Sequence, residues 1–206
     1  MAVKSPILSY FPTLIYEAPL IKNSKSLNSL VKESKLDSLR IFEHDNEGHK
    51  WSQSHYANGY TSYSSISKLH EMNSTFMDLR KHIDKHVVKY VKALGLETED
   101  SLEMVSCWLN IMPPGGTHSL HLHPLAVISG TFYVEVPKGS GVIKFEDPRL
   151  SKMMAAPPRK DKFESGAFAR ITPQKGHLVL FESWLRHEVE VNRGKNERIS
   201  ISFNYA

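Results

Sequence analysis

Three histidines in the second half of the chain have the side chains and the spacing to close on one metal ion. His121 and His123 lie two residues apart in a run that reads as extended. On a strand, residues two apart face the same side, so both imidazoles can point into one pocket. His187 follows much later and supplies a third nitrogen donor. Imidazole binds iron, zinc, copper and nickel, so the set predicts a metal site without naming its metal.

The interpretation of His121 and His123 as metal ligands is supported by the neighbouring residues more than by their own spacing. The chain has 11 histidines, and an isolated pair is more often a surface or structural feature than a site. Taken alone, His187 also reads as a structural histidine. Gly115-Gly116 before the pair and Pro124 after it indicate a strand that ends at a turn, where functional sites tend to lie.

An anion site is predicted close to the third histidine. Arg198 and Ser200 share one face of an expected strand soon after His187. Arginine pairs bidentately with a carboxylate, and a serine hydroxyl adds one donor. Tyr133 and Asn110 are further candidates for hydrogen bonds to such an anion, although ordinary strand packing explains each of them equally well.

Short strands must position these side chains. From about residue 102 the chain shows extended runs separated by turn residues, among them Pro113-Pro114-Gly115-Gly116. The expected strands are 102–112, 117–123, 127–136, 141–146, 167–172, 177–182, 187–192 and 197–204. This number of short strands suggests a sandwich or jelly roll.

Two helices are expected in the first half of the chain. Residues 24–42 and 74–94 carry apolar side chains at helical spacing. Ser74 or Thr75 can serve as the N-cap of the second helix, and Gly95 stands where a helix stop is expected. Because the helices precede the strands, they are expected to pack on the outside of one sheet as support.

Three further segments are less regular. Residues 6–17 can hold one or two short strands, and the polar stretch 43–66 is predicted to be a long loop. Residues 148–166 are too long for a tight turn and can form a binding loop. The tyrosines of the 55–66 stretch are alternative candidates for lining a substrate entrance, although a plain surface loop is slightly favoured.

Composition predicts one soluble, cytoplasmic domain. The 206 residues are 40% hydrophobic, and the net charge is +4 with a pI of about 9.0. We expect a supporting part (1–100) and a jelly-roll core (101–206). The lysines and arginines are interspersed with acids, so no clear nucleic-acid signal is present. The single cysteine, Cys107, fits a reducing compartment, and no apolar run approaches the length of a membrane span.

The combination of these motifs resembles the iron(II)- and 2-oxoglutarate-dependent dioxygenases, in particular a bacterial and phage group of that superfamily. The segments that carry the resemblance are Trp108-Leu109-Asn110, His121-Leu122-His123-Pro124, Ser129-Gly130-Thr131-Phe132-Tyr133, Phe145-Glu146-Asp147-Pro148-Arg149, the run from Glu182 to His187, and the run from Glu197 to Asn204. They cover about half of the chain. The resemblance implies a double-stranded β-helix, that is, a mainly β, cupin-like jelly roll with flanking helices.

The resemblance also implies roles for the site residues. His121 matches the first iron ligand of the family and His187 the distal one, while His123 stands where the family normally has Asp or Glu. A third neutral ligand leaves the site one negative charge short of the usual triad. His118 or Asp147 are alternative members of the ligand set. His118 is disfavoured, because a residue three away from His121 faces away on a regular strand.

By the same resemblance, Arg198 and Ser200 bind the distal carboxylate of 2-oxoglutarate, with Tyr133 and Asn110 as further contacts. The expected reaction consumes dioxygen and 2-oxoglutarate, forms succinate and carbon dioxide, and hydroxylates a small-molecule or peptidyl substrate. Members of the superfamily are often dimers, so a homodimer is a further expectation.

Two other functions fit the histidines. A cupin-like dioxygenase with three histidine ligands uses no 2-oxoglutarate, and Arg198 and Ser200 would have no purpose in it. A non-catalytic jelly-roll module that binds zinc or nickel is the second alternative. A β domain that binds no metal is the third alternative.

Overall fold

The fold is built from two antiparallel sheets and three α-helices. The structure is a computed structural model that describes residues 10–56, 58–97, 102–150, 154 and 166–206. The helices are α1 (Ser24–His44), α2 (Asn46–His55) and α3 (Ser74–Leu94), with a 3-10 turn at Leu69–Glu71. The strands are β1 (Tyr16–Pro19), β2 (Tyr60–Thr61), β3 (Met104–Met112), β4 (His118–His121), β5 (Ile128–Glu135), β6 (Ile143–Glu146), β7 (Phe168–Ile171), β8 (His177–Glu182), β9 (His187–Val189) and β10 (Arg198–Tyr205).

The two sheets face each other across an inner layer of apolar side chains. The larger sheet has the order β1-β8-β5-β10-β3-β2, and the smaller has the order β4-β9-β6-β7. Tyr133 and Phe181 from the larger sheet pack with Ile143 and Phe145 from the smaller one. This arrangement is a double-stranded β-helix, so the predicted mainly β jelly roll with helical support is confirmed.

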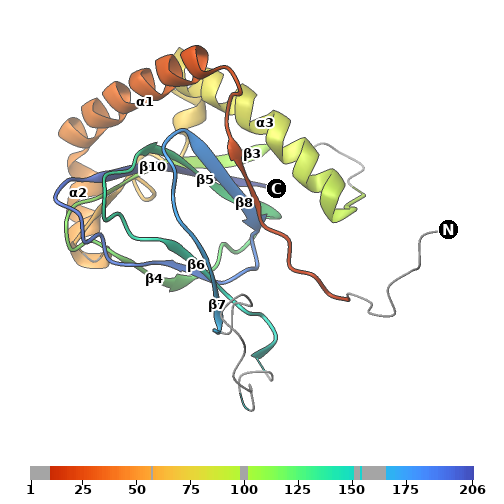
Figure 1. The fold of residues 1–206 in the computed structure, drawn as a ribbon. Helices are drawn as coiled ribbons and strands as arrows, with labels where there is room; N and C mark the ends of the chain where they lie inside the picture. Colours follow the sequence, from red (N-terminus) through yellow and green to blue (C-terminus); the bar gives the residue numbers. More distant parts are fainter. Residues whose placement is uncertain (1–9, 57, 98–101, 151–153, 155–165) are drawn as a thin grey trace.

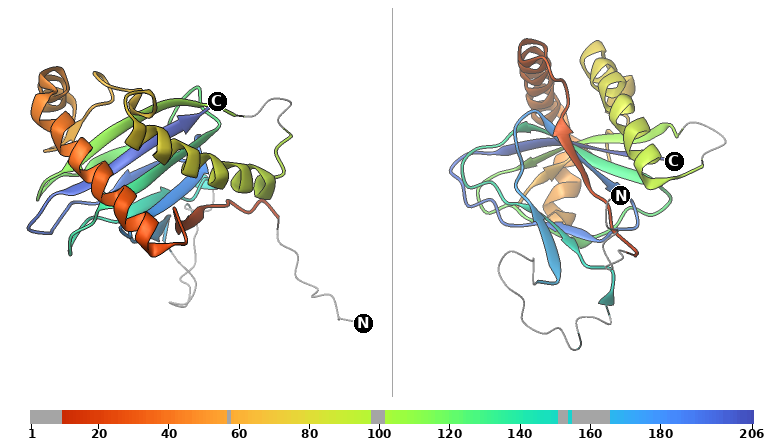
Figure 2. Two further views of the ribbon diagram at one scale, coloured as in Figure 1. Left: turned by 90° about the horizontal axis from the view of Figure 1, so that it is seen from above. Right: turned by 45° about the vertical axis from the view of Figure 1, so that its right-hand side comes forward.

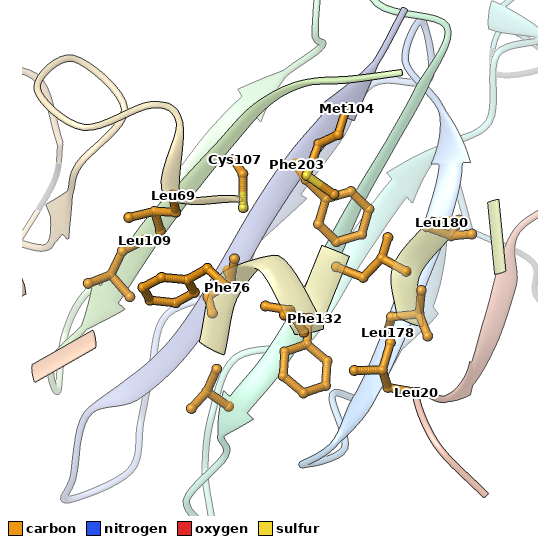
Figure 3. Packing of buried hydrophobic residues seen from close by; sticks show 14 of the residues in the cluster. Leu20, Leu69, Phe76, Met104, Cys107, Leu109, Phe132, Leu178, Leu180 and Phe203 are labelled. Atoms are coloured by element: carbon orange, nitrogen blue, oxygen red, sulfur yellow. The ribbon is translucent and has the colours of Figure 1, made fainter. Parts of the chain in front are cut away.

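Helices α1 and α3 cover the outer face of the larger sheet (Figures 1 and 2). Phe76 and Ile83 of α3 are buried against Leu109 and Phe132 of the sheet. Figure 3 shows this packing, with Phe76 and Phe132 among the buried side chains. Since successive strand residues face opposite sides, Phe132 joins this outer core while Tyr133 points between the sheets. The helices therefore stabilise the sheet from behind and leave its inner face free for a site.

The ends of α3 show how closely local signals place an element. The Asn73 side chain accepts a hydrogen bond from the backbone N–H of Phe76 at 3.0 Å and caps the helix. The predicted cap at Ser74 or Thr75 was therefore one or two residues late. Gly95 ends the helix with a φ of 68°, in the left-handed region that glycine adopts without strain, as expected.

The predicted loop at 43–66 was wrong, because this segment contains α2 and β2. The carboxylate of Asp45 is buried and organises the segment. It accepts a hydrogen bond from the N–H of Gly48 at 2.9 Å, which caps α2, and another from the Tyr60 hydroxyl at 2.6 Å. Helix α2 is stabilised by the Asp45 cap and by the pairing of β2 with β3, not by a strong apolar stripe. Hydrophobic periodicity therefore did not predict it.

All eight strands expected after residue 102 are present, with ends that differ by a few residues. Only Tyr16 and Glu17 of the expected strand region 6–17 lie in β1, which pairs with β8. Most of the predicted loop 148–166 lies outside the described residues. None of the described helices combines the length and the apolar character needed to cross a membrane.

Candidate active site

Two paired strands of the smaller sheet, β4 and β9, bring His121 and His187 together. His121 ends β4 and lies opposite His187, which begins β9, so their ring centroids are 4.2 Å apart. His123 follows β4 and is held by a hydrogen bond from its N–H to the carbonyl of Ser183 at 3.0 Å. The Nε2 atoms of His121 and His123 are 3.3 Å apart, and the donor atoms of all three histidines lie within 4.8 Å of one another.

The outer nitrogen of two of these rings meets a backbone carbonyl. His121 Nδ1 lies 2.8 Å from the carbonyl oxygen of Ser119, and His187 Nδ1 lies 2.9 Å from that of Leu185. A carbonyl only accepts hydrogen bonds, so each Nδ1 carries the proton and donates it. Each Nε2 then holds a lone pair directed at the shared centre, which is the form in which histidine binds a metal.

His123 is oriented by a buried polar network instead. Its Nδ1–H donates to the side-chain oxygen of Asn204 at 2.7 Å. The Ser129 hydroxyl donates to the same oxygen at 2.8 Å and lies 2.7 Å from the Ser183 hydroxyl. Asn204, Ser129 and Ser183 are all buried, so the network fixes both the tautomer and the direction of the His123 ring.

Burial also keeps the three imidazoles uncharged. Removal from water, together with the neighbouring histidines, lowers the pKa of His187 to about 2 and that of His123 to about 4. The pKa of His121 is lowered for the same reason. Three neutral nitrogen donors that converge without a proton between them form a donor set that suits a divalent transition metal.

The structure places the two alternative ligands differently from the sequence expectation. The ring of His118 lies 4.0 Å from that of His121 and lines the same cavity, so the expectation that it faces away was wrong. The pairing of β4 with β9 is irregular between these two residues, and this breaks the simple alternation of sides. Asp147 pairs with Arg149 at 2.9 Å and is absent from the described residues that line the cavity.

Arg198 brings a buried positive charge to the same cavity. Its side chain is 3% exposed, and one terminal nitrogen donates to the carbonyl of Gly141 at 3.2 Å. The Nε atom is buried without a hydrogen-bond partner, and no described acidic group forms an ion pair with the guanidinium. A buried cation without a counter-ion is costly, so this position is suited to an anionic ligand.

The comparisons with known proteins agree with this geometry. Residues 106–204 match the family model described as "Putative 2OG-Fe(II) oxygenase". This segment of the chain therefore resembles the 2OG-Fe(II) oxygenase family. The match includes the three histidines and Arg198.

Solved structures share the fold of this chain at low sequence identity. A prolyl-4-hydroxylase from Pseudomonas putida superposes with a TM-score of 0.61 at 15% identity, covering 94% of this chain and 92% of its own. The α-ketoglutarate-dependent epimerase SnoN from nogalamycin biosynthesis gives 0.66 at 12%, with 94% and 76% covered. HygX from Streptomyces hygroscopicus gives 0.60 at 11%, with 94% and 83% covered. No curated protein matches the sequence.

The other predicted contacts of the anion site lie around Arg198, but not all of them line the cavity. Ser200 and Asn110 line the cavity, and the Asn110 amide already donates to the Ser202 hydroxyl at 3.0 Å. Tyr133 is not among the residues that border the space. Its ring lies 5.0 Å from the Arg198 guanidinium, and its buried hydroxyl has no hydrogen-bond partner.

Sequence reasoning missed one hydroxyl group of this cavity, that of Thr131, and gave no role at the anion site to a second, that of Tyr56. Tyr56 and Thr131 line it, and both hydroxyls are buried without a hydrogen-bond partner. Thr131 precedes Tyr133 by two residues on the same face of β5, so strand alternation was a usable signal. Tyr56 belongs to the 55–66 stretch, whose tyrosines the sequence offered only as candidates for lining a substrate entrance, and it borders both this cavity and the pocket beside it.

Proposed function

We propose that the chain is an iron(II)- and 2-oxoglutarate-dependent dioxygenase that hydroxylates an organic substrate. One dioxygen molecule supplies one oxygen atom to succinate and one to the new hydroxyl group, and 2-oxoglutarate loses carbon dioxide. The observation that carries the proposal is the convergence of three neutral histidine nitrogens beside the buried, unpaired guanidinium of Arg198.

His121, His123 and His187 are the proposed ligands of iron. Bound iron would supply the redox chemistry that activates dioxygen. The chain holds the rings in place through their Nδ1 hydrogen bonds and keeps their Nε2 lone pairs free of protons near neutral pH. Because the protein supplies no carboxylate from the described lining residues, the negative charge at this centre comes from the cosubstrate.

Arg198 and Ser200 are the proposed partners of the distal carboxylate of 2-oxoglutarate. The guanidinium is fixed by Gly141 and by the face of Tyr133, so it loses little freedom when the anion binds. The hydroxyls of Thr131 and Tyr56 line the cavity without a hydrogen-bond partner and are further candidate donors to the same anion, and the Tyr133 hydroxyl is a candidate behind Arg198. Asn110 supplies a further amide at the wall. A buried, cationic recess of this kind favours a small dicarboxylate.

A dioxygenase with three histidine ligands and no 2-oxoglutarate is the second candidate function. The absence of a carboxylate among the described lining residues favours it. Arg198 favours the first candidate, because its buried charge has no acidic partner among the described residues and an anionic cosubstrate would supply one.

The proposal is tested by turnover of the cosubstrate alone. Purified protein is incubated in air with iron(II), ascorbate and 2-oxoglutarate, and succinate is quantified by mass spectrometry. We expect slow succinate formation that requires iron(II) and falls at least tenfold in Arg198→Met. Iron-loaded protein that forms no succinate above the iron-only control contradicts the proposal.

A further inference from the structure

A second, wider pocket opens on the outer side of the histidines. Its volume is about 240 Å³, and it shares His121 and His123 with the inner cavity. Arg198 borders only the inner cavity. His121 and His123 border both spaces, as do His118, Tyr56, Trp108 and Asn110, whereas His187 borders only the inner cavity. A group bound in the outer pocket therefore lies next to the proposed metal. This inference rests on the proposed function for the position of the metal.

Aromatic rings form the main wall of this outer pocket. Trp108 is 7% exposed, and its ring lies 5.7 Å from that of His123. Tyr63, which is 52% exposed, meets Trp108 edge-on with ring centroids 5.0 Å apart. Trp51 and Tyr56 complete the aromatic set. The wall thus runs from the molecular surface to a proposed metal ligand, and flat rings bind best against such faces.

The described side chains that line the outer pocket include no acidic or basic residue that could pair with an ionised group. Among the described residues that line it, none is Asp, Glu, Lys or Arg. Its polar groups are uncharged, including the amides of Asn110 and Asn204 and the hydroxyl of Thr61. In the metal-free protein, an ammonium or carboxylate placed here would lose water without gaining a counter-ion, and that loss weakens its binding strongly.

We propose that the outer pocket binds the substrate of this enzyme through an uncharged ring stacked on Trp108, with a C–H bond of that ring or its substituent facing the metal. Any charged groups of the substrate must project past Tyr63 and Leu122 towards solvent, since both side chains are exposed at the rim.

Three indoles that differ in charge test this inference. Neutral indole, anionic indole-3-acetate and cationic tryptamine are titrated into the metal-free protein, and indole alone is titrated into the zinc-loaded protein, because a carboxylate can coordinate zinc directly. The tryptophan Nε1–H resonances are followed by NMR. The chain carries Trp51 and Trp108 in the pocket and Trp184 outside it, which serves as an internal control. We expect indole to move only the resonances of the two pocket tryptophans, and both charged analogues to bind at least tenfold more weakly.

Variants distinguish specific binding in the outer pocket from nonspecific binding elsewhere on the protein. Trp108→Ala should weaken indole about tenfold or more, and Tyr63→Ala should weaken it without disturbing a buried position. Trp184→Phe is the matched control and should bind as the parent protein does. Equal or tighter binding of a charged analogue, equal shifts at all three tryptophans, or no shift at any tryptophan overturns the inference. Indole binding needs no metal, so failure of zinc to load would contradict the proposed function alone.

Discussion

The proton on each of the three central histidines is placed by the acceptor that its Nδ1 meets. For His121 and His187 this acceptor is a backbone carbonyl only two residues away. For His123 it is the side chain of Asn204, which comes from β10 of the other sheet. The ligand set is thus fixed partly by local backbone shape and partly by a contact between sheets, and these two origins can be tested separately.

Loss of a proposed ligand should abolish metal binding, whereas loss of its neighbour should not. We expect His187→Ala to lower iron(II) affinity by more than the roughly 10- to 100-fold typical of outer-sphere changes. His118→Ala is the control, because its ring lies beside His121 but outside the converging group. Metal content and calorimetric titration measure both. Loss of iron from His118→Ala, with retention in His187→Ala, would reverse the ligand assignment.

Removal of the Asn204 acceptor should loosen His123 without removing a ligand. We expect Asn204→Ala to weaken metal binding about 10- to 100-fold, since the ring loses the bond that sets its tautomer. Asn110→Ala removes a nearby amide that does not contact His123, and it should leave metal affinity within about threefold. Competition with a chelator of known affinity provides the measurement. Equal effects of the two substitutions would argue against an orienting role.

The residues with a distinctive chemistry could be predicted from the sequence, while their orientation could not. His121, His123, His187 and Arg198 stand out by type and spacing, and all four line one cavity. The direction of His118 depends on an irregular strand pairing that residue alternation does not show.

At the scale of elements, the loop between β5 and β6 accepts a hydrogen bond from Arg198 and so links this side chain to the smaller sheet. Gly141 accepts a hydrogen bond from Arg198, and a Cβ at this glycine would lie 1.8 Å from the carbonyl oxygen of Glu190. Backbone therefore passes directly over backbone here, and only glycine permits that approach.

Substitution of this glycine should destabilise the fold. We expect Gly141→Ala to lower the free energy of unfolding by roughly 2 kcal/mol or more, because backbone must move to admit the methyl group. Gly166→Ala is the matched control, since its nearest contact would be 3.7 Å away. Urea denaturation of both variants gives the comparison. Equal stability of the two variants would show that the close approach of Gly141 to Glu190 does not affect the free energy of unfolding.

Elements with a repeated apolar pattern could be predicted, and elements held by single polar contacts could not. The strands after residue 102 and the helices α1 and α3 follow from periodicity and turn residues. Helix α2 depends on the buried carboxylate of Asp45 and its bonds to Gly48 and Tyr60, which no local pattern shows.

At the scale of the molecule, the two sheets bury the histidines deeply enough to couple stability to pH. The folded-state pKa values of His187 (about 2) and His123 (about 4) lie below that of an unfolded histidine, near 6.5. Below pH 6.5 the unfolded chain binds protons that the folded chain excludes. The stabilisation is therefore present above that pH and is lost as the pH falls towards the folded-state values.

This linkage predicts a less stable metal-free protein in mild acid. Between about pH 6.5 and 5, each such histidine should reduce the free energy of unfolding by up to roughly 1.4 kcal/mol per pH unit. His187→Phe is expected to show a smaller slope, since its ring packs between Phe145 and Phe181 and cannot titrate. Urea denaturation across this range measures the slopes. A flat profile, or an unchanged slope in the variant, would contradict the buried neutral state.

The central claim is that the three histidines and Arg198 together hold iron(II) and 2-oxoglutarate. Anaerobic titration of iron(II)-loaded protein with 2-oxoglutarate tests it most directly, because chelation of iron by the keto acid produces a visible charge-transfer absorbance. We predict a saturable band that weakens at least tenfold in apparent affinity in Arg198→Met and is absent from His187→Ala. Iron-loaded protein that shows no band at saturating 2-oxoglutarate would contradict the claim.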